Sequence, residues 1–310
     1  MPGTGAGDQH GHHDEASGAD GERREERHGS APRWEMPAGP AGDAERRRAA
    51  VRGQIPVVDT LREAASLVNQ NRGTVLLPLL AVTFPVALVI SILTVVLFLT
   101  AWSDEALVST ATITEQTPAP IVFTLLVFTA VEVLFAQVAR AAAIVAIAGA
   151  AAGKRTSLAE ALDPAFNKIG GILVLIGVFI AGFFLGVLTI VGLIIVPYLF
   201  LRIAVSLEAY MLDGGSIWNS FGRSWAVMQG NMLRLLGLLL LTGACVLPVI
   251  VLVSLLGGSI EGDRTTELVM FAGWSLAQAI ILIPIVALFT ACTTLYYLKA
   301  RAIHDGRGPA

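Results

Sequence analysis

Long runs of apolar residues alternate with short polar segments along most of this chain. A helix needs roughly 20 apolar residues to cross a bilayer. Runs of at least that length lie at about 75–101, 120–150, 169–207, 233–256 and 268–298. At about 1.5 Å per residue the third run is too long for one crossing and suits two, 169–189 and 193–211. The pattern therefore predicts an all-α integral membrane protein with six transmembrane helices.

Three short amphipathic segments precede the first, third and fifth predicted spans. Each has apolar residues at positions i, i+4 and i+8, which places one apolar stripe on a short helix. The matched positions are Val57, Leu61 and Ala65; Leu158, Leu162 and Phe166; Ile217, Phe221 and Trp225. Ser157 with Glu160 resembles a capping box at the start of the second segment. We predict three parallel pseudo-repeats, each a cytoplasmic interfacial helix followed by an outgoing and a returning span. The alternative is chance, since amphipathic loops are common in membrane proteins.

The loop charges predict the orientation of these spans. Arginines and lysines concentrate before the first, third and fifth spans and after the sixth, whereas the opposite loops are acidic. The positive-inside rule then places both termini in the cytoplasm of a multi-pass protein of the cytoplasmic (plasma) membrane. The same rule accounts for the Arg-Arg-Arg run at 46–48, so nucleic-acid binding has no support.

Overall composition agrees with a membrane protein that carries a polar tail. The 310 residues are 55% hydrophobic and 15% charged, with a mean hydropathy of +0.70. Residues 1–55 lack aliphatic runs and predict a disordered cytoplasmic tail, which leaves 56–306 as the membrane domain. Histidines in that tail could bind a divalent metal or belong to a solvated low-complexity segment. Both cysteines lie in apolar runs, which favours packing over a disulfide, and no cofactor or metal site is expected.

Several motifs together indicate a family. The segment 199–241 joins an arginine-bearing span to a short helix with Ser-Trp, a Gly-Asn turn and a new span. GKRTSLAEAL (153–162) and TLYYLKARAIHDG (294–306) accompany it. Over about 56–306 the chain resembles the membrane domain associated with glycerophosphoryl diester phosphodiesterases and related six-span proteins of unassigned function. One departure is Leu298, where the family pattern would continue Tyr-Tyr with Asp.

The resemblance does not imply phosphodiesterase activity. In that family the chemistry belongs to a separate soluble barrel of roughly 250 residues. Neither the polar tail nor the short segment after the last span offers such a domain. No metalloprotease, nucleophile-elbow or nucleotide-loop motif occurs either. We therefore expect a protein that is not an enzyme.

Polar residues inside the apolar runs are the candidate site. Glu132 lies about 11 residues into the second span, near the bilayer centre, where an unpaired charge costs several kcal/mol. Arg202 and Gln278 are predicted at similar depth, with Gln137 one turn further inward. We predict a buried polar layer of these four residues. The layer either fixes helix register or binds an ion, proton or head group, and the sequence leaves both open.

Residues near the predicted cytoplasmic interface are candidate anchors. Arg140 lies near the inner end of the second span, where its stem can reach the head groups. Trp218, Trp225, Tyr296 and Tyr297 are aromatic residues of the type enriched at that depth.

Two functions follow from these features. The interfacial helices and basic cytoplasmic face favour a non-enzymatic protein that organises or senses membrane lipids. The alternative is a transporter or channel that uses the polar layer around Glu132 and Arg202. Membrane lipids are the expected partners, and a second copy of the chain or another membrane protein is left open.

Overall fold

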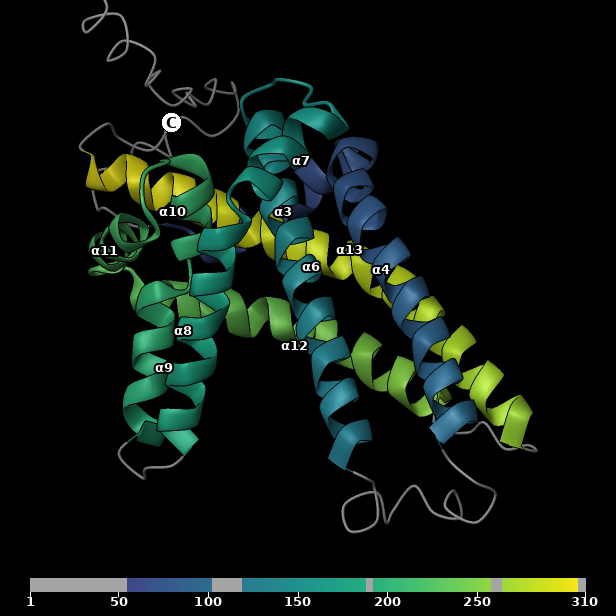
Figure 1. Ribbon diagram of the computed structural model, residues 1–310. Helices are drawn as coiled ribbons and strands as arrows, with labels where there is room; N and C mark the ends of the chain where they lie inside the picture. Colours follow the sequence, from purple (N-terminus) through teal and green to yellow (C-terminus); the bar gives the residue numbers. More distant parts are fainter. Residues whose placement is uncertain (1–54, 102–118, 188–191, 258–263, 306–310) are drawn as a thin grey trace, which may run out of the picture. The chain divides into compact units, whose positions relative to one another are not determined.

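The computed structural model describes residues 55–101, 119–187, 192–257 and 264–305, and every regular element within them is a helix (Figure 1). The chain divides into two units, residues 1–33 and 34–310, and all described residues belong to the second. The helices are α3 (Val57–Gln70), α4 (Arg72–Ala101), α6 (Ala119–Ala151), α7 (Leu158–Asn167), α8 (Ile169–Val187), α9 (Gly192–Ile203), α10 (Ser206–Leu212), α11 (Ile217–Met228), α12 (Met232–Gly257) and α13 (Arg264–His304). The all-α prediction is confirmed for this part of the chain. The predicted tail, 1–55, lies almost wholly outside it.

Four of these helices are long and apolar enough to cross a membrane. The qualifying stretches are Arg72–Leu97 of α4, Ile121–Ala151 of α6, Met232–Leu252 of α12 and Ala272–His304 of α13. Helices α7 and α8 pass the same test only as a pair, which is bent by 63°, and would make a fifth span. The described helices therefore fit a multi-pass membrane protein with four or five spans.

The predicted fourth span, 193–211, is not one continuous helix. It breaks after Ile203, and α10 begins at Ser206, whose hydroxyl donates a hydrogen bond to the Ile203 carbonyl oxygen at 2.6 Å. Helix α9 has 12 residues and so extends about 18 Å, less than the apolar thickness of a bilayer. All seven residues of α10 are buried, Glu208 among them. After the break, α10 carries Glu208 into the protein core.

Short helices form at each of the three amphipathic segments. The capping box predicted for α7 is confirmed: the Glu160 amide donates to Ser157 Oγ at 3.3 Å, and the Ser157 amide donates to Glu160 Oε2 at 2.9 Å. Helix α11 is capped in a similar way, because Ser216 Oγ accepts a hydrogen bond from the Asn219 amide. Gly230, with φ of 80°, then makes the left-handed turn that leads into α12.

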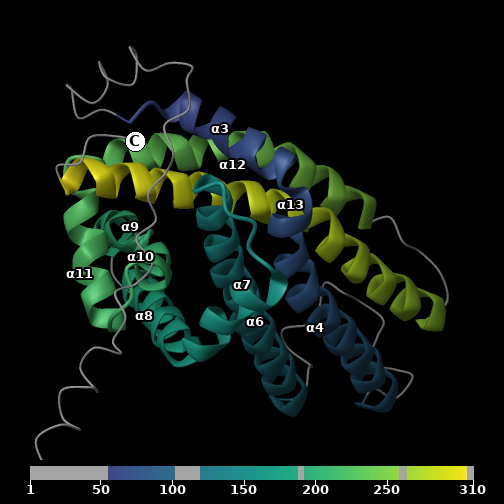
Figure 2. The ribbon, with the colours of Figure 1, turned by 90° about the horizontal axis from the view of Figure 1, so that it is seen from above.

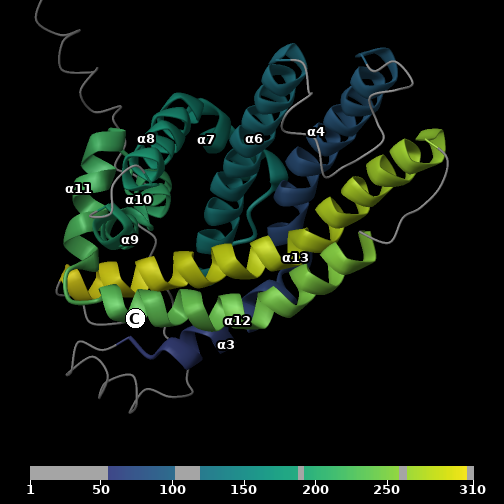
Figure 3. The same cartoon turned by 90° about the horizontal axis from the view of Figure 1, so that it is seen from below.

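Helix α13, like α6, packs against most of the other described helices. It contacts α3, α4, α6, α10, α11 and α12, and it runs beside α12 with α3 against both (Figures 2 and 3). Helices α4 and α6 lie side by side, and α8 packs on α9 (Figure 1). The buried apolar core lies where the second half of α6, α10 and the end of α13 meet. Ala141, Ala142 and Ala143 are completely buried there, since small side chains allow close helix approach.

Large apolar side chains are exposed along the other halves of the long helices. Examples are Leu93 and Leu99 of α4, Phe123 and Leu126 of α6, and Leu255 of α12. Their exposure is costly in water but neutral in hydrocarbon. This distribution suits helices whose outer surfaces face lipid.

Candidate functional site

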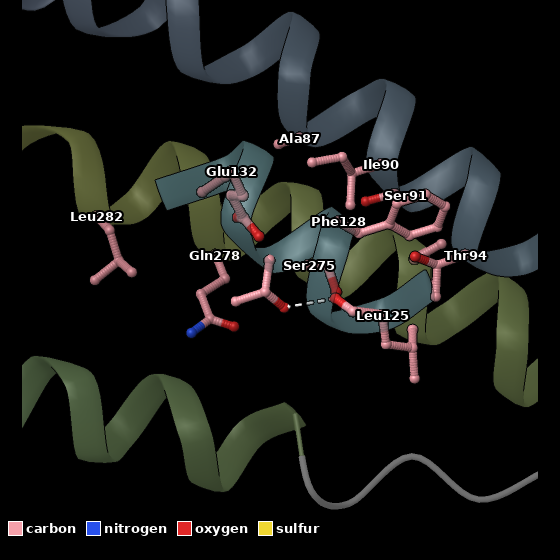
Figure 4. A pocket seen from close by; sticks show the side chains of 13 residues that line it. Ala87, Ile90, Ser91, Thr94, Leu125, Phe128, Glu132, Ser275, Gln278 and Leu282 are labelled. Atoms are coloured by element: carbon pink, nitrogen blue, oxygen red, sulfur yellow. Dashed lines mark hydrogen bonds between the residues drawn. The ribbon is translucent and has the colours of Figure 1, made fainter. Parts of the chain in front are cut away.

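A cavity between α4, α6 and α13 contains two of the four residues of the predicted polar layer. It has a volume of about 350 Å³, and Glu132 and Gln278 line it. Four hydroxyl side chains share the lining: Ser91, Thr94, Thr129 and Ser275. In Figure 4 Ser91 and Thr94 come from α4, Glu132 from α6, and Ser275 and Gln278 from α13. We call this space the Glu132 cavity.

Apolar side chains complete the walls of the Glu132 cavity. Ile90, Leu125, Phe128 and Leu282 are prominent among them (Figure 4). A second cavity, of about 150 Å³, also reaches Glu132 and is lined mainly by apolar residues of the same three helices. Glu132 thus lies where a mixed cavity meets a mostly apolar one. It is exposed, and not buried as the predicted layer required.

Arg202 does not line the Glu132 cavity, in contrast to the predicted layer. Its guanidinium group donates to the Tyr198 hydroxyl at 2.9 and 3.2 Å. It also lies over the Trp225 ring, 4.7 Å from the ring centroid, and donates to the Trp225 carbonyl oxygen at 3.4 Å. Arg202 therefore joins α9 to α11. Gln137 is half-buried on α6 and lines neither cavity.

Arg140 forms a buried ion pair instead of extending freely to the membrane interface. Its Nη2 lies 2.7 Å from Glu208 Oε1, and the Glu208 side chain is fully buried. Thr293 Oγ1 donates to the same Oε1 atom at 2.6 Å, and the Arg140 guanidinium carbon lies 5.7 Å from the centroid of the Phe289 ring. This triad of Arg140, Glu208 and Thr293 connects α6, α10 and α13 in the core.

Sequence reasoning missed Glu208 because it comes directly after the long apolar run and was assigned to the end of a span. The overlooked signal was its charge: Glu208 is an acid flanked by apolar residues near the predicted inner end of a span, and Arg140 is a base in the same setting. Opposite charges at matching depth are candidates for a pair.

Tyr296 and Tyr297 were predicted as interfacial anchors, but both are completely buried. The Tyr296 hydroxyl donates to the Asn231 carbonyl oxygen at 2.6 Å, and the Tyr297 hydroxyl donates to Asp213. Their hydroxyls satisfy polar groups of the loops on either side of α11, so these tyrosines pack the core. Trp218 and Trp225 are exposed, with 67% and 42% of their surface accessible, as membrane anchors need to be.

A cluster of charged residues joins α11 to the end of α13. Arg223 lies 3.2 Å from Asp213 and 2.7 Å from Asp305, and Arg301 lies 2.6 Å from Asp213. Partial burial acts to raise the pKa of Asp305, but hydrogen bonds from Arg223 and His304 and the charges of Arg223 and Arg301 hold it below its ordinary value. The cluster holds opposite charges in balance and is a structural connection.

Comparison of this chain with protein-family models, with curated proteins and with solved structures gave no match. Within the described residues no group of three or more His, Cys, Asp or Glu side chains is placed to hold a metal ion. The candidate site is therefore defined by its geometry: one carboxylate, neutral oxygen-bearing groups and apolar walls.

Proposed function

We propose that this chain is a non-enzymatic protein of the cytoplasmic membrane that binds and organises lipids. In this proposal it spans the membrane six times, with both termini in the cytoplasm, and consists of three parallel repeats. Helix α8 would form the third span, and α9 together with α10 the fourth. Each of α3, α7 and α11 is short and followed by a long apolar helix, which supports the repeat.

The resemblance to the phosphodiesterase-associated membrane domain is part of the same proposal. Its motifs lie at the short capped helices. GKRTSLAEAL leads into α7, the Ser-Trp motif lies in α11, and the Gly-Asn motif lies in the turn before α12. A membrane domain of this kind would act through lipids or partner proteins.

The observation that carries the lipid proposal is the exposure of large aromatic residues on the short helices. Trp218 and Trp225 on α11 and Phe166 on α7 are exposed, although burial would be expected of such side chains in water. Amphipathic rings of this kind suit the interface between head groups and acyl chains. Lys154 and Arg155, in the loop before α7, are exposed and would attract anionic head groups.

Lipid binding is tested by native mass spectrometry of the purified full-length chain. The protein is offered equal amounts of phosphatidylglycerol and phosphatidylcholine, and the retained lipids are counted. We expect enrichment of phosphatidylglycerol, reduced severalfold by the double substitution Lys154→Gln and Arg155→Gln. Asp163→Asn, an exposed change on α7, is the control and should not reduce it. Equal retention of both lipids by the wild type would refute the proposal.

The Glu132 cavity favours a second candidate function, a transporter or channel. Transport requires a water-accessible path to Glu132 from one side of the membrane. Thr129 lines the cavity one turn from Glu132, so a Thr129→Cys variant without the two native cysteines reports on access. Labelling by a membrane-impermeant thiol reagent would support the transporter. Complete protection from both sides, with labelling after denaturation, would exclude it.

A further inference from the structure

We propose that the Glu132 cavity is a binding site for an ammonium group carried on an apolar body. This inference goes beyond the lipid-organising function and does not depend on it. It rests on three properties of the cavity: its charge, its size and its mixed walls.

The cavity holds one acidic side chain. Glu132 is the one titratable residue among the side chains that line it, and no described lysine, arginine or histidine is among them. Arg202, the base that the sequence suggested as a partner, bonds to Tyr198 and Trp225. A carboxylate at membrane depth requires a counter-charge, a proton or water. A bound cation supplies the counter-charge directly.

The size and donor set of the cavity favour an organic cation over a bare metal ion. A volume of about 350 Å³ falls in the range of small-molecule sites, roughly 300–1,000 Å³. Calcium takes about 6–8 oxygen ligands at about 2.3–2.6 Å and usually several carboxylates, whereas Glu132 is a single carboxylate. Hydroxyls of Ser91 and Thr94 can accept hydrogen bonds from an ammonium group.

The walls match the apolar body of such a ligand. Phe128 lines the cavity, and an aromatic face attracts a cation within about 6 Å of its centroid. Beyond Glu132 the second cavity is lined by Val86, Phe135 and Ile283. A ligand with its ammonium group at Glu132 can therefore extend its hydrocarbon portion along this apolar surface.

Two sources can supply the same chemistry: a free organic amine or quaternary ammonium compound, and a lipid with an ammonium head group such as phosphatidylethanolamine. The two sources share a positively charged nitrogen, and those with N–H bonds can also donate to Ser91 and Thr94. The experiment below includes one arm for each source.

The first arm uses benzyltrimethylammonium and its uncharged carbon isostere, neopentylbenzene, as probes of the purified full-length chain in detergent. We expect the charged probe to bind at least tenfold more tightly than the neutral one. Glu132→Gln should abolish this preference, Glu132→Asp should retain most of it, and Asp163→Asn outside the cavity should leave it unchanged. The charged-to-neutral comparison needs only the wild type, so it holds even if Glu132→Gln folds poorly.

The second arm measures retention of phosphatidylethanolamine against phosphatidylethanol, which lacks the ammonium group, by native mass spectrometry. Glu132-dependent preference for phosphatidylethanolamine alone identifies a lipid as the ligand, and preference for the soluble cation alone identifies a free amine. Either result supports the site. The proposal is overturned if neither charged ligand is preferred, or if Glu132→Gln retains the preference in full.

Discussion

Removing the carboxylate of Glu208 is predicted to destabilise the fold strongly. Glu208 is fully buried, and its Oε1 atom accepts hydrogen bonds from the Arg140 guanidinium at 2.7 Å and from the Thr293 hydroxyl at 2.6 Å. In Glu208→Leu the guanidinium group, with 19% of the Arg140 side chain accessible, keeps its charge but loses its partner. Breaking a buried pair in this way costs about 3–5 kcal/mol. The partial access of Arg140 to solvent favours the lower end, about 3 kcal/mol.

The double variant Arg140→Met with Glu208→Leu should recover much of that loss. Apolar residues of similar volume can replace a buried ion pair at little cost, because no charge remains to be desolvated. Thr293→Val removes one hydrogen bond and should cost only about 0.6–1.7 kcal/mol. We therefore expect the unfolding free energy to be lowest for Glu208→Leu and close to the wild-type value for the double variant. This order distinguishes a charge pair from simple loss of packing.

The assay is reversible unfolding in mixed micelles by titration with sodium dodecyl sulfate, followed by circular dichroism. All four proteins are measured at the same pH and lipid-to-detergent ratio. An unfolding free energy of Glu208→Leu within about 0.5 kcal/mol of wild type, the usual range for surface changes, would refute the ion-pair reasoning.

Two further changes test the packing and the charged cluster. A Cβ on Gly171 would overlap the Tyr210 phenol ring, whereas a Cβ on Gly170 would meet open space. We therefore expect Gly171→Ala to lower the unfolding free energy by about 1–3 kcal/mol. Gly170→Ala is the control and should not lower it. Because the folded-state pKa of Asp305 is depressed, its contribution to stability is present above the unfolded-state value of about 3.9 and is lost as the pH falls through the folded-state value. Asp305→Asn should therefore be less stable than wild type at pH 7, and the difference should shrink in unfolding experiments carried towards pH 3; a constant difference would contradict the Arg223 contact.

The positions of the helices could be predicted because hydropathy and periodicity are local signals. The apolar runs and the i, i+4, i+8 stripes depend only on neighbours in sequence, and Ser157 with Glu160 forms the expected cap. Helix α13 extends to His304, past the predicted end at 298, because Lys299 and Arg301 bind carboxylates on other elements: Lys299 lies 2.6 Å from Glu63 and Arg301 lies 2.6 Å from Asp213. The helix continues where its polar end has partners.

The partners of the polar residues could not be predicted because they depend on which helices pack together. Depth along a span suggested a buried layer that contains Glu132 and Gln278; both line one cavity, since α6 and α13 are in contact, but Glu132 is exposed. Depth alone also suggested Arg202, but α9 packs against α8, α11 and α12, so its arginine meets Trp225 instead. The break before α10, which buries Glu208, has no hydropathy signal.

The six-span arrangement is tested most directly at the connection between α8 and α9. In a variant without native cysteines, Thr189→Cys is exposed to a membrane-impermeant thiol reagent on intact cells, with Ala159→Cys on α7 as the cytoplasmic control. We expect Thr189→Cys to be labelled from outside and Ala159→Cys to be labelled only after permeabilisation. Labelling of Thr189→Cys only after permeabilisation would mean that α8 and α9 do not cross, which would contradict both the six spans and the threefold repeat.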